Sequence, residues 1–280
     1  MKISFFTASM HRYPIEKSFE IASKFGYDGM EIWGGRPHAY APDMRPEDIE
    51  KINLLSEKYH LPIVSFEPDM ANLLWRDQRW IDESMEYFKQ CIDLCKAIHC
   101  PYMVMAALQA SYEYSTDEDW AQFIKYVKEL ADYSESIDGV TMILETVTPW
   151  EGNILIRSDD VVRAMKEIRS PKVKAMLDLA APLTVGEPAS QYFDKLGKEL
   201  VHIHLVDCKK DIEDHLILGD GELPVEEVLT MIDSYGYDGY CSVELFDEYR
   251  TDPILYNLKA IRAIRTALQN VGLEQGKNIV

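Results

Sequence analysis

The chain has 280 residues, 47% of them hydrophobic, which is enough for one large core or two modest ones. Its 48 Asp and Glu residues against 29 Lys and Arg give a formal net charge of -19. Such a field repels nucleic acids and anionic membranes, so we expect neither as a partner.

The five cysteines are an odd number, and the N-terminal stretch has no apolar run long enough for a signal peptide. These features favour a cytoplasmic protein. Cys91 and Cys95 lie one helical turn apart and near Cys100, a spacing that could bind a metal ion. No second cluster in the sequence completes a four-ligand site, however. Packed core thiols are the preferred interpretation.

Short β-rich segments alternate with longer segments of helical period along the whole chain, in eight cycles. The predicted strands are residues 2–7, 29–33, 62–66, 102–106, 140–145, 173–178, 201–207 and 240–245. The amphipathic stretches between them include residues 15–26, 47–60, 84–99, 118–137 and 159–169. Gly26, Gly139 and Gly236 stand where helices are expected to end.

This alternation predicts an α/β fold, a single (β/α)8 TIM barrel over residues 1–280 with a loose tail from about residue 270. A doubly wound sheet usually shows a dinucleotide fingerprint after its first strand, and none is present here. GYDGM at 26–30 and GYDGY at 236–240 are near copies, each leading from a helix end into a strand. Such copies are typical of repeated units of one architecture.

Polar side chains stand at the C-terminal ends of the last four predicted strands, where the chemistry of such barrels gathers. They are Glu145, Asp178, His204 and Glu244. Because neighbouring strands lie about 4.8 Å apart, the three carboxylates would repel one another unless a cation joined them. The pattern therefore predicts a divalent metal site, which suits Mn²⁺ or Co²⁺, with Mg²⁺, Ni²⁺ and Zn²⁺ as alternatives.

Each of these residues also has an interpretation without a metal. A carboxylate at a strand end often caps a helix or pairs with a cation, and for Asp178 alone capping is preferred. His202 and His204 point the same way along their strand, and a core histidine is the alternative interpretation for one of them. Four independent caps seldom select these residue types at four successive strand ends, which favours the metal site.

Two glutamates on opposite sides of a metal-bound substrate would form a proton-transfer site. The ion acidifies the C–H beside a ketone, one glutamate removes that proton and the other returns one to the opposite face, so the carbon is inverted. Transfers on a single face between adjacent carbons would interconvert an aldose and a ketose instead. Expulsion of a β-hydroxyl would make the enzyme a lyase or dehydratase. The spacing of the residues does not separate these reactions.

Six segments carry a resemblance to a known family: GYDGMEIWGGRPHAYAPD, ILETVTPWEG, MLDLAAP, SQYFDKLG, HIHLVD and GYDGYCSVEL. From its start to about residue 265, the chain resembles the xylose-isomerase-like sugar isomerases and epimerases. Within this superfamily it resembles the fructoselysine 3-epimerases most, and the ketose 3-epimerases less. The resemblance implies a metal-dependent 3-epimerase of a ketosugar or an Amadori compound of the fructoselysine or psicoselysine type. It also implies a homo-oligomer, a dimer or tetramer.

The resemblance also assigns roles to residues. The metal ligands of the family match Glu145, Asp178, His204 and Glu244, and its catalytic acid/base pair matches the two glutamates among them. Glu151 matches a carboxylate that holds substrate hydroxyls in ketose epimerases, and His215 occupies the place of a substrate-binding arginine. Ala181 stands where those epimerases carry a histidine, which favours a substrate held differently from a plain ketose.

A second group of polar and aromatic residues follows other predicted strands. Trp33 ends the second predicted strand, His38 lies in the polar loop after it, and Glu67 follows the third strand. We expect these residues to bind substrate, and packing of the aromatic rings on neighbouring loops or on a second subunit is the alternative. Asp207 either orients the ring of His204 or caps the segment that follows. No Gly-rich phosphate cradle follows the last two strands, which predicts a non-phosphorylated substrate.

Two rival functions are less well supported by the residues. A DNA repair nuclease of similar fold needs a trinuclear zinc cluster, and the chain has only seven histidines, few of them at strand ends. A sugar sensor without turnover would have no use for a complete set of ligands. An enzyme of the isomerase class is therefore the expectation.

Overall fold

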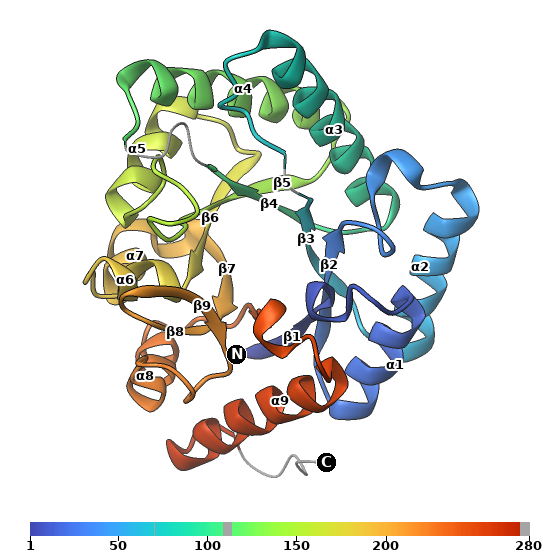
Figure 1. Cartoon of the computed structure of the whole chain (residues 1–280), viewed down its shortest axis with the longest axis vertical. Helices are drawn as coiled ribbons and strands as arrows, with labels where there is room; N and C mark the ends of the chain where they lie inside the picture. Colours follow the sequence, from blue (N-terminus) through green and yellow to red (C-terminus); the bar gives the residue numbers. More distant parts are fainter. Residues whose placement is uncertain (70, 109–113, 275–280) are drawn as a thin grey trace.

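Eight parallel strands close into a barrel in the computed structural model, which describes residues 1–69, 71–108 and 114–274 (Figure 1). Around the barrel β10 follows β7 and pairs with β1, so the sheet has no edge. The predicted TIM barrel is confirmed. The strands are β1 (Lys2–Phe6), β2 (Gly29–Gly34), β3 (Ile63–Pro68), β4 (Tyr102–Ala106), β5 (Thr141–Glu145), β6 (Val173–Asp178), β7 (Leu200–Leu205) and β10 (Tyr240–Val243).

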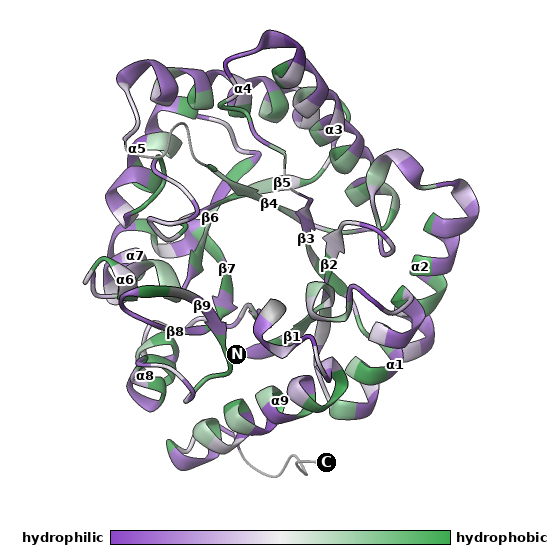
Figure 2. Ribbon diagram, in the orientation of Figure 1, coloured by the Kyte–Doolittle hydropathy of each residue, from purple (hydrophilic) through white to green (hydrophobic). Residues whose placement is uncertain are grey.

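Helices surround the barrel, and Figure 2 shows the hydrophilic residues of helices such as α2 on the outer side. The α-helices are α1 (Ile15–Phe25), α2 (Pro46–Tyr59), α3 (Gln78–Ala97), α4 (Asp117–Ser136), α5 (Ser158–Ile168), α6 (Ala180–Thr184), α7 (Ser190–Leu196), α8 (Val225–Ser234) and α9 (Pro253–Asn270). Short 3-10 helices are η1 (Thr7–Met10), η2 (Ala41–Asp43), η3 (Gly197–Glu199) and η4 (Asp247–Tyr249). An antiparallel ribbon of β8 (Asp207–Lys209) and β9 (Ile212–Leu216) follows β7. Among the described residues, no helix combines the length and apolar character needed to cross a membrane.

The helix ends follow from local sequence chemistry. The hydroxyl of Thr116 accepts a main-chain N–H in the first turn of α4, and Gly26 ends α1 with a φ of 79°. Gly139 departs from its predicted capping role, because the left-handed residue after α4 is Asp138, with a φ of 50°. Gly139 is instead required by a close approach, since a Cβ there would lie 2.8 Å from the hydroxyl of Ser134.

The inward-facing residues of the strands form two layers, because side chains alternate across a strand and those two residues apart share a face. The lower layer contains, in chain order, Ser4, Glu31, Ser65, Val104, Ile143, Met176, His202 and Ser242. The upper layer, two residues further along each strand, contains Phe6, Trp33, Glu67, Ala106, Glu145, Asp178, His204 and Glu244. The outward-facing residues pack in the main core under the helices. The polar groups of the upper layer therefore lie nearer to the C-terminal end of the barrel than those of the lower layer on the same strands.

The strand boundaries differ from the predicted ones in ways that matter for the site. Glu67, expected after the third strand, lies within β3, and β2 continues one residue beyond Trp33, the last residue of the second predicted strand. The prediction of a loose tail partly concerns residues 275–280, which lie outside the described residues. Before them the chain is anchored, since Leu273 N–H donates to the Leu268 carbonyl and Glu274 pairs with Arg265 at 2.6 Å.

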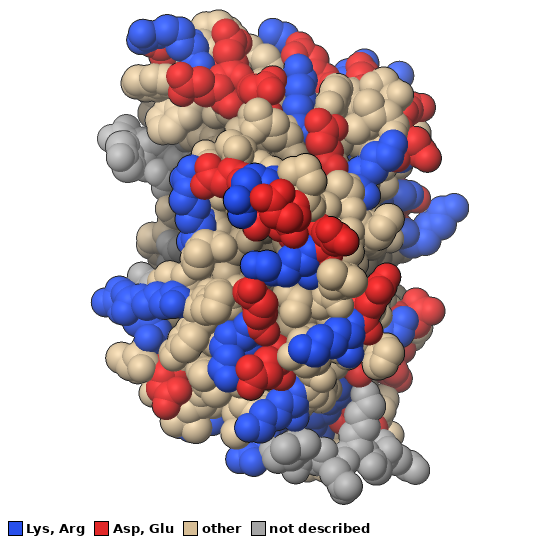
Figure 3. All heavy atoms as spheres, turned by 90° about the vertical axis from the view of Figure 1, so that its right-hand side faces the viewer, with Lys and Arg blue, Asp and Glu red and all other residues tan. Residues whose placement is uncertain are grey.

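One face of the molecule mixes charges of both signs despite the acidic composition. On the face shown in Figure 3, acidic and basic side chains alternate, and Lys51 of α2 pairs with Glu16 of α1 at 2.9 Å. All five cysteines are buried and unbridged, and no candidate metal-ligand group within the described part of the chain includes one. The interpretation as packed core thiols is therefore confirmed.

Candidate active site

The four side chains predicted as metal ligands converge at the C-terminal end of the barrel. Asp178 lies beside His204 in the strand register, and Glu244 follows β10 on the other side of His204. The Nδ1 atom of His204 is 3.1 Å from Glu145 Oε1, 3.2 Å from Glu244 Oε2 and 3.9 Å from Asp178 Oδ2. The two glutamates thus approach a single imidazole nitrogen together with the aspartate.

Two buried atoms of this cluster have no hydrogen bond with any described residue: His204 Nδ1 and Glu244 Oε2. Buried polar atoms normally find a partner, so a pair of them facing each other indicates a missing ligand. One imidazole and three carboxylates are a donor set typical of divalent ions such as Mn²⁺. The residues therefore fit a metal ion.

The electrostatics of the cluster agree with this interpretation. Burial raises the pKa of Glu145 to about 7 and that of Glu244 well above its usual range. Burial by itself would lower the pKa of His204, but the charges of Glu244 and Glu31 outweigh it, and the pKa of the ring is well above 6.5. The cluster by itself therefore keeps protons that a divalent cation would replace.

Asp178 combines the two roles that the sequence left open for it. Its Oδ1 atom accepts the N–H groups of Ala180 and Ala181, at 2.6 and 3.2 Å, and so caps the first turn of α6. Its Oδ2 atom faces His204. The cap fixes the orientation of the carboxylate, and the second oxygen remains available to a cation.

Glu31 is a functional residue that sequence reasoning missed. It is fully buried in the lower layer, with Oε1 3.2 Å from His204 Nε2 and Oε2 2.9 Å from His202 Nε2. Because Nε2 of His204 faces a carboxylate, the proton of the ring is held on that side and Nδ1 is turned to the upper cluster. The signal in the sequence was an acid in the middle of the otherwise apolar strand GMEIW.

His202 is the satisfied core histidine of the pair. Its Nε2 atom lies 3.2 Å from Ser65 Oγ and 3.1 Å from Ser242 Oγ, in addition to Glu31. Ser242 is in turn 2.7 Å from Ser4 Oγ. A hydrogen-bonded network thus joins five of the eight residues of the lower layer and ends on the candidate metal ligand His204.

We expect Glu31→Gln to weaken Mn²⁺ binding about 10- to 100-fold, because an amide holds the proton of His204 less firmly than a carboxylate does. Calorimetric titration with Mn²⁺ would measure the change. Ser65→Ala is the matched control, since Ser65 touches His202 and not His204. Equal affinity in the Glu31 variant and the wild type would remove the orienting role of Glu31.

A cavity of about 1040 Å³ opens above the cluster. Four of the predicted substrate contacts line it: Trp33, Glu67, Glu151 and His215. Nε2 of His215 is 3.8 Å from Glu244 Oε2, and its ring packs edge-on against Phe246. The cavity wall also contains exposed tryptophans, at positions 75 and 150. A sugar-sized molecule therefore has both polar groups and aromatic faces to contact.

Two acids of the cavity, Glu151 and Glu67, differ in the hydrogen bonds that their carboxylates already make. Oε2 of Glu151 accepts the N–H and the hydroxyl of Thr148, both at 2.9 Å, which fixes the loop after β5. Glu67 Oε2 is buried and makes no hydrogen bond with any described residue, and burial followed by the charge of Glu145 raises the pKa of Glu67 well above its usual range. Glu67 thus enters the cavity with a group that needs a partner.

His38, unlike the other predicted substrate contacts, does not line this cavity as the described residues form it. It is buried, its Nε2 atom lies 2.9 Å from the carbonyl of Tyr13, and its ring packs edge-on against Trp33. Burial lowers the pKa of His38 to about 4, so the ring is neutral near pH 7. His38 therefore packs against the ring of Trp33 and helps to hold it in position.

Asp207 caps the following loop instead of orienting His204. Its carboxylate accepts the N–H groups of Cys208, Gly219, Gly221 and Leu223 at 2.8–3.0 Å. These bonds anchor the ribbon that carries His215.

The fold and this cluster define a TIM-barrel enzyme with acid/base groups and a candidate metal centre at the C-terminal ends of its strands. Residues 19–268 match the family described as xylose isomerase-like TIM barrel, and the chain belongs to that family. It is 38% identical over 272 residues to fructoselysine 3-epimerase of Escherichia coli O157:H7, covering 96% of this chain and 98% of that protein. The prediction of an enzyme of the isomerase class is confirmed by this family and relative.

Solved structures share the fold at lower identity. A D-tagatose 3-epimerase-like protein superposes with a TM-score of 0.81 at 19% identity, covering 97% of this chain and 98% of that one. The IOLI protein, whose structure contains a zinc atom, superposes with a TM-score of 0.80 at 19% identity, covering 99% of this chain and 100% of that one. At this identity the likeness concerns the fold alone.

Proposed function

We propose that the chain is a divalent-metal-dependent epimerase that inverts C3 of a non-phosphorylated ketosugar or Amadori compound of the fructoselysine or psicoselysine type. The observation that carries the proposal is the pair of carboxylates, Glu145 and Glu244, 3.1 and 3.2 Å from one imidazole nitrogen at the base of an open cavity. The kinship to fructoselysine 3-epimerase supports the same substrate type.

Glu145, Asp178, His204 and Glu244 would hold the metal ion. When bound, the ion supplies Lewis acidity that polarises the ketone and weakens the C–H bond at C3. Mn²⁺ and Co²⁺ remain the predicted ions. A dimer or tetramer also remains a prediction, which a sedimentation measurement would test.

The residues of the chain perform the proton transfers. One glutamate accepts the C3 proton, and the other, on the opposite side of the substrate, donates a proton to the other face of the planar enediolate, so the configuration is inverted. Burial raises the pKa of Glu145 to about 7 and that of Glu244 well above its usual range, so either carboxyl group can hold a proton that an exposed carboxylate would lose.

The loop after β9 supports a substrate without a phosphate group. Gly219 and Gly221 provide main-chain N–H groups of the kind that often bind phosphate, but both donate to the carboxylate of Asp207. A Cβ at residue 221 would lie 2.3 Å from Asp207 Oδ1, so glycine is required for this internal contact. The glycines therefore serve the fold of the loop.

Solvent exchange tests the proposal. Incubating fructoselysine and plain ketoses with the enzyme and Mn²⁺ in D₂O should place deuterium at C3, which NMR detects. Deuterium confined to C1 would point to an aldose-ketose isomerase, and a product that has lost the mass of water would point to a lyase or dehydratase. Either of these results would replace the epimerase.

A further inference from the structure

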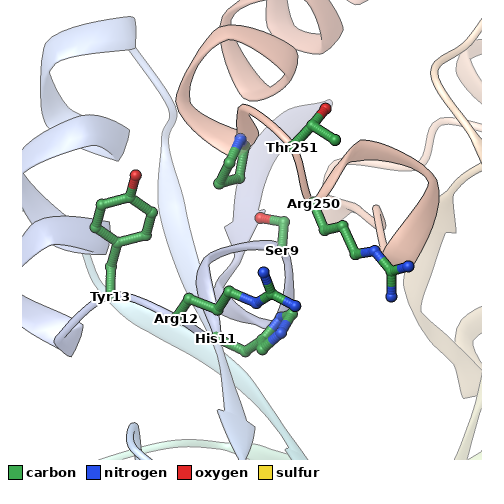
Figure 4. A pocket seen from close by; sticks show the side chains of 7 residues that line it. Ser9, His11, Arg12, Tyr13, Arg250 and Thr251 are labelled. Carbon is green, nitrogen blue, oxygen red and sulfur yellow. The ribbon is translucent and has the colours of Figure 1, made fainter.

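Figure 4 shows a second pocket, of about 310 Å³. Its polar lining consists of Ser9, His11, Arg12, Tyr13, Arg250 and Thr251. The first four lie in or just after η1, and the last two lie just before α9, so the pocket joins the segments that follow the neighbouring strands β1 and β10. His11 lines both this pocket and the larger cavity, and its ring also contacts Trp33 edge-on. The pocket is therefore an annex of the active site.

The charge of the pocket is opposite to that of the chain. Two arginines line it, whereas acidic residues outnumber basic ones by 48 to 29 over the whole sequence. Arg12 is exposed and makes no hydrogen bond or ion pair with any described residue. Other arginines do pair with acids: Arg36, Arg45, Arg76, Arg79, Arg163 and Arg265. An unpaired guanidinium in such an acidic protein indicates a site for an anion.

The kind of anion follows from the donors that the pocket still offers. The N–H groups of His11 and Tyr13 already donate to the carbonyls of Ala8 and Met10. The hydroxyl of Ser9 already donates to the carbonyl of Phe6 and accepts from an asparagine of α9. The remaining donors include the guanidinium N–H groups of Arg12 and the Thr251 hydroxyl. A planar guanidinium fork matches a carboxylate by two parallel hydrogen bonds, whereas a phosphate usually also uses main-chain N–H groups.

We infer that this annex binds the free carboxylate of an amino acid joined to the sugar, with Arg12 as the residue that recognises it. The inference rests on the proposed function, because it places the keto carbon at the glutamates and the far end of the same substrate past His11. It makes the enzyme specific for amino-acid adducts over plain ketoses. A flexible side chain such as that of lysine would span the two sites.

The test compares fructoselysine with the fructose adduct of cadaverine, which is the same compound without the carboxylate. We expect Arg12→Gln to lower the ratio of kcat/KM for the acid to kcat/KM for the amine about 10- to 100-fold, mainly through KM. Arg12→Lys, which keeps the charge and loses the fork, should lower it less. Arg169→Gln is the matched control, because it removes the same charge at the far end of α5. An unchanged ratio in Arg12→Gln would overturn the inference.

Two further measurements separate the possible failures. Calorimetry would measure the binding of fructoselysine to the wild type and to Arg12→Gln, and it does not require turnover. If binding depends on Arg12 but no deuterium enters C3, the proposed reaction is rejected and the annex is kept. Exchange at C3 with equal binding by both proteins would reject the annex and keep the reaction.

Inorganic phosphate is the second probe. Competition by phosphate that depends on Arg12, together with an unchanged acid-to-amine ratio, would assign the pocket to phosphate and overturn the carboxylate.

Discussion

Glu145→Gln and Glu244→Gln are each expected to lower kcat for C3 epimerisation by about 10²- to 10⁴-fold, the usual contribution of a general acid or base. The physical reason is that inversion needs a proton acceptor on one face of C3 and a proton donor on the other. An amide of the same shape fills the space but accepts no proton. Steady-state assays with fructoselysine or a plain ketose would measure the loss.

The same variants should separate the two half-reactions. With one glutamate removed, one epimer should still exchange its C3 proton with D₂O without inversion, and the other epimer should not exchange. The preferred epimer should be opposite in the two variants. Glu199→Gln, which changes the charge equally at the opposite end of the barrel, is the control. Loss of exchange from both epimers in both variants would mean that the two carboxylates act only as ligands.

Removal of metal by a chelator should lower the rate of epimerisation at least about 10³-fold, because Lewis acidity stabilises such a transition state by several kcal/mol. Addition of Mn²⁺ or Co²⁺ should restore it. Asp178→Asn should need more metal for the same activity, because the Oδ2 atom that faces His204 would lose its charge. Full activity of the chelated protein would contradict a metal-dependent mechanism.

Metal binding should also release protons near pH 7. The pKa of Glu145 is about 7 and those of Glu244 and His204 are well above their usual ranges, so the cluster carries protons that compete with a cation. Calorimetry in two buffers of different ionisation enthalpy would report the released protons as a difference in apparent heat. Equal heats in both buffers would mean that the cluster is already deprotonated.

The eight strands and the end of the barrel at which polar residues meet could be predicted from the sequence. A strand is recognised by its own composition, and the period of two residues brings Glu145, Asp178 and His204 to one face of their strands. The positions of strand ends were less accurate: Gly34 and Glu67 lie inside strands, because pairing between β2 and β3 extends both strands beyond their apolar runs.

Contacts between distant strands could be decided only by the tertiary structure. Glu31 on β2 lies under His204 because the barrel brings together residues that are far apart in the chain, and its sequence neighbours give no hint of that partner. The burial of His38 behind Trp33 and the capping role of Asp207 depend on loop conformations in the same way. So does the annex at Arg12, since its two walls come from opposite ends of the chain. The sequence by itself determined the kinds of groups available, because composition and periodicity act locally, and three-dimensional packing decided which of them meet.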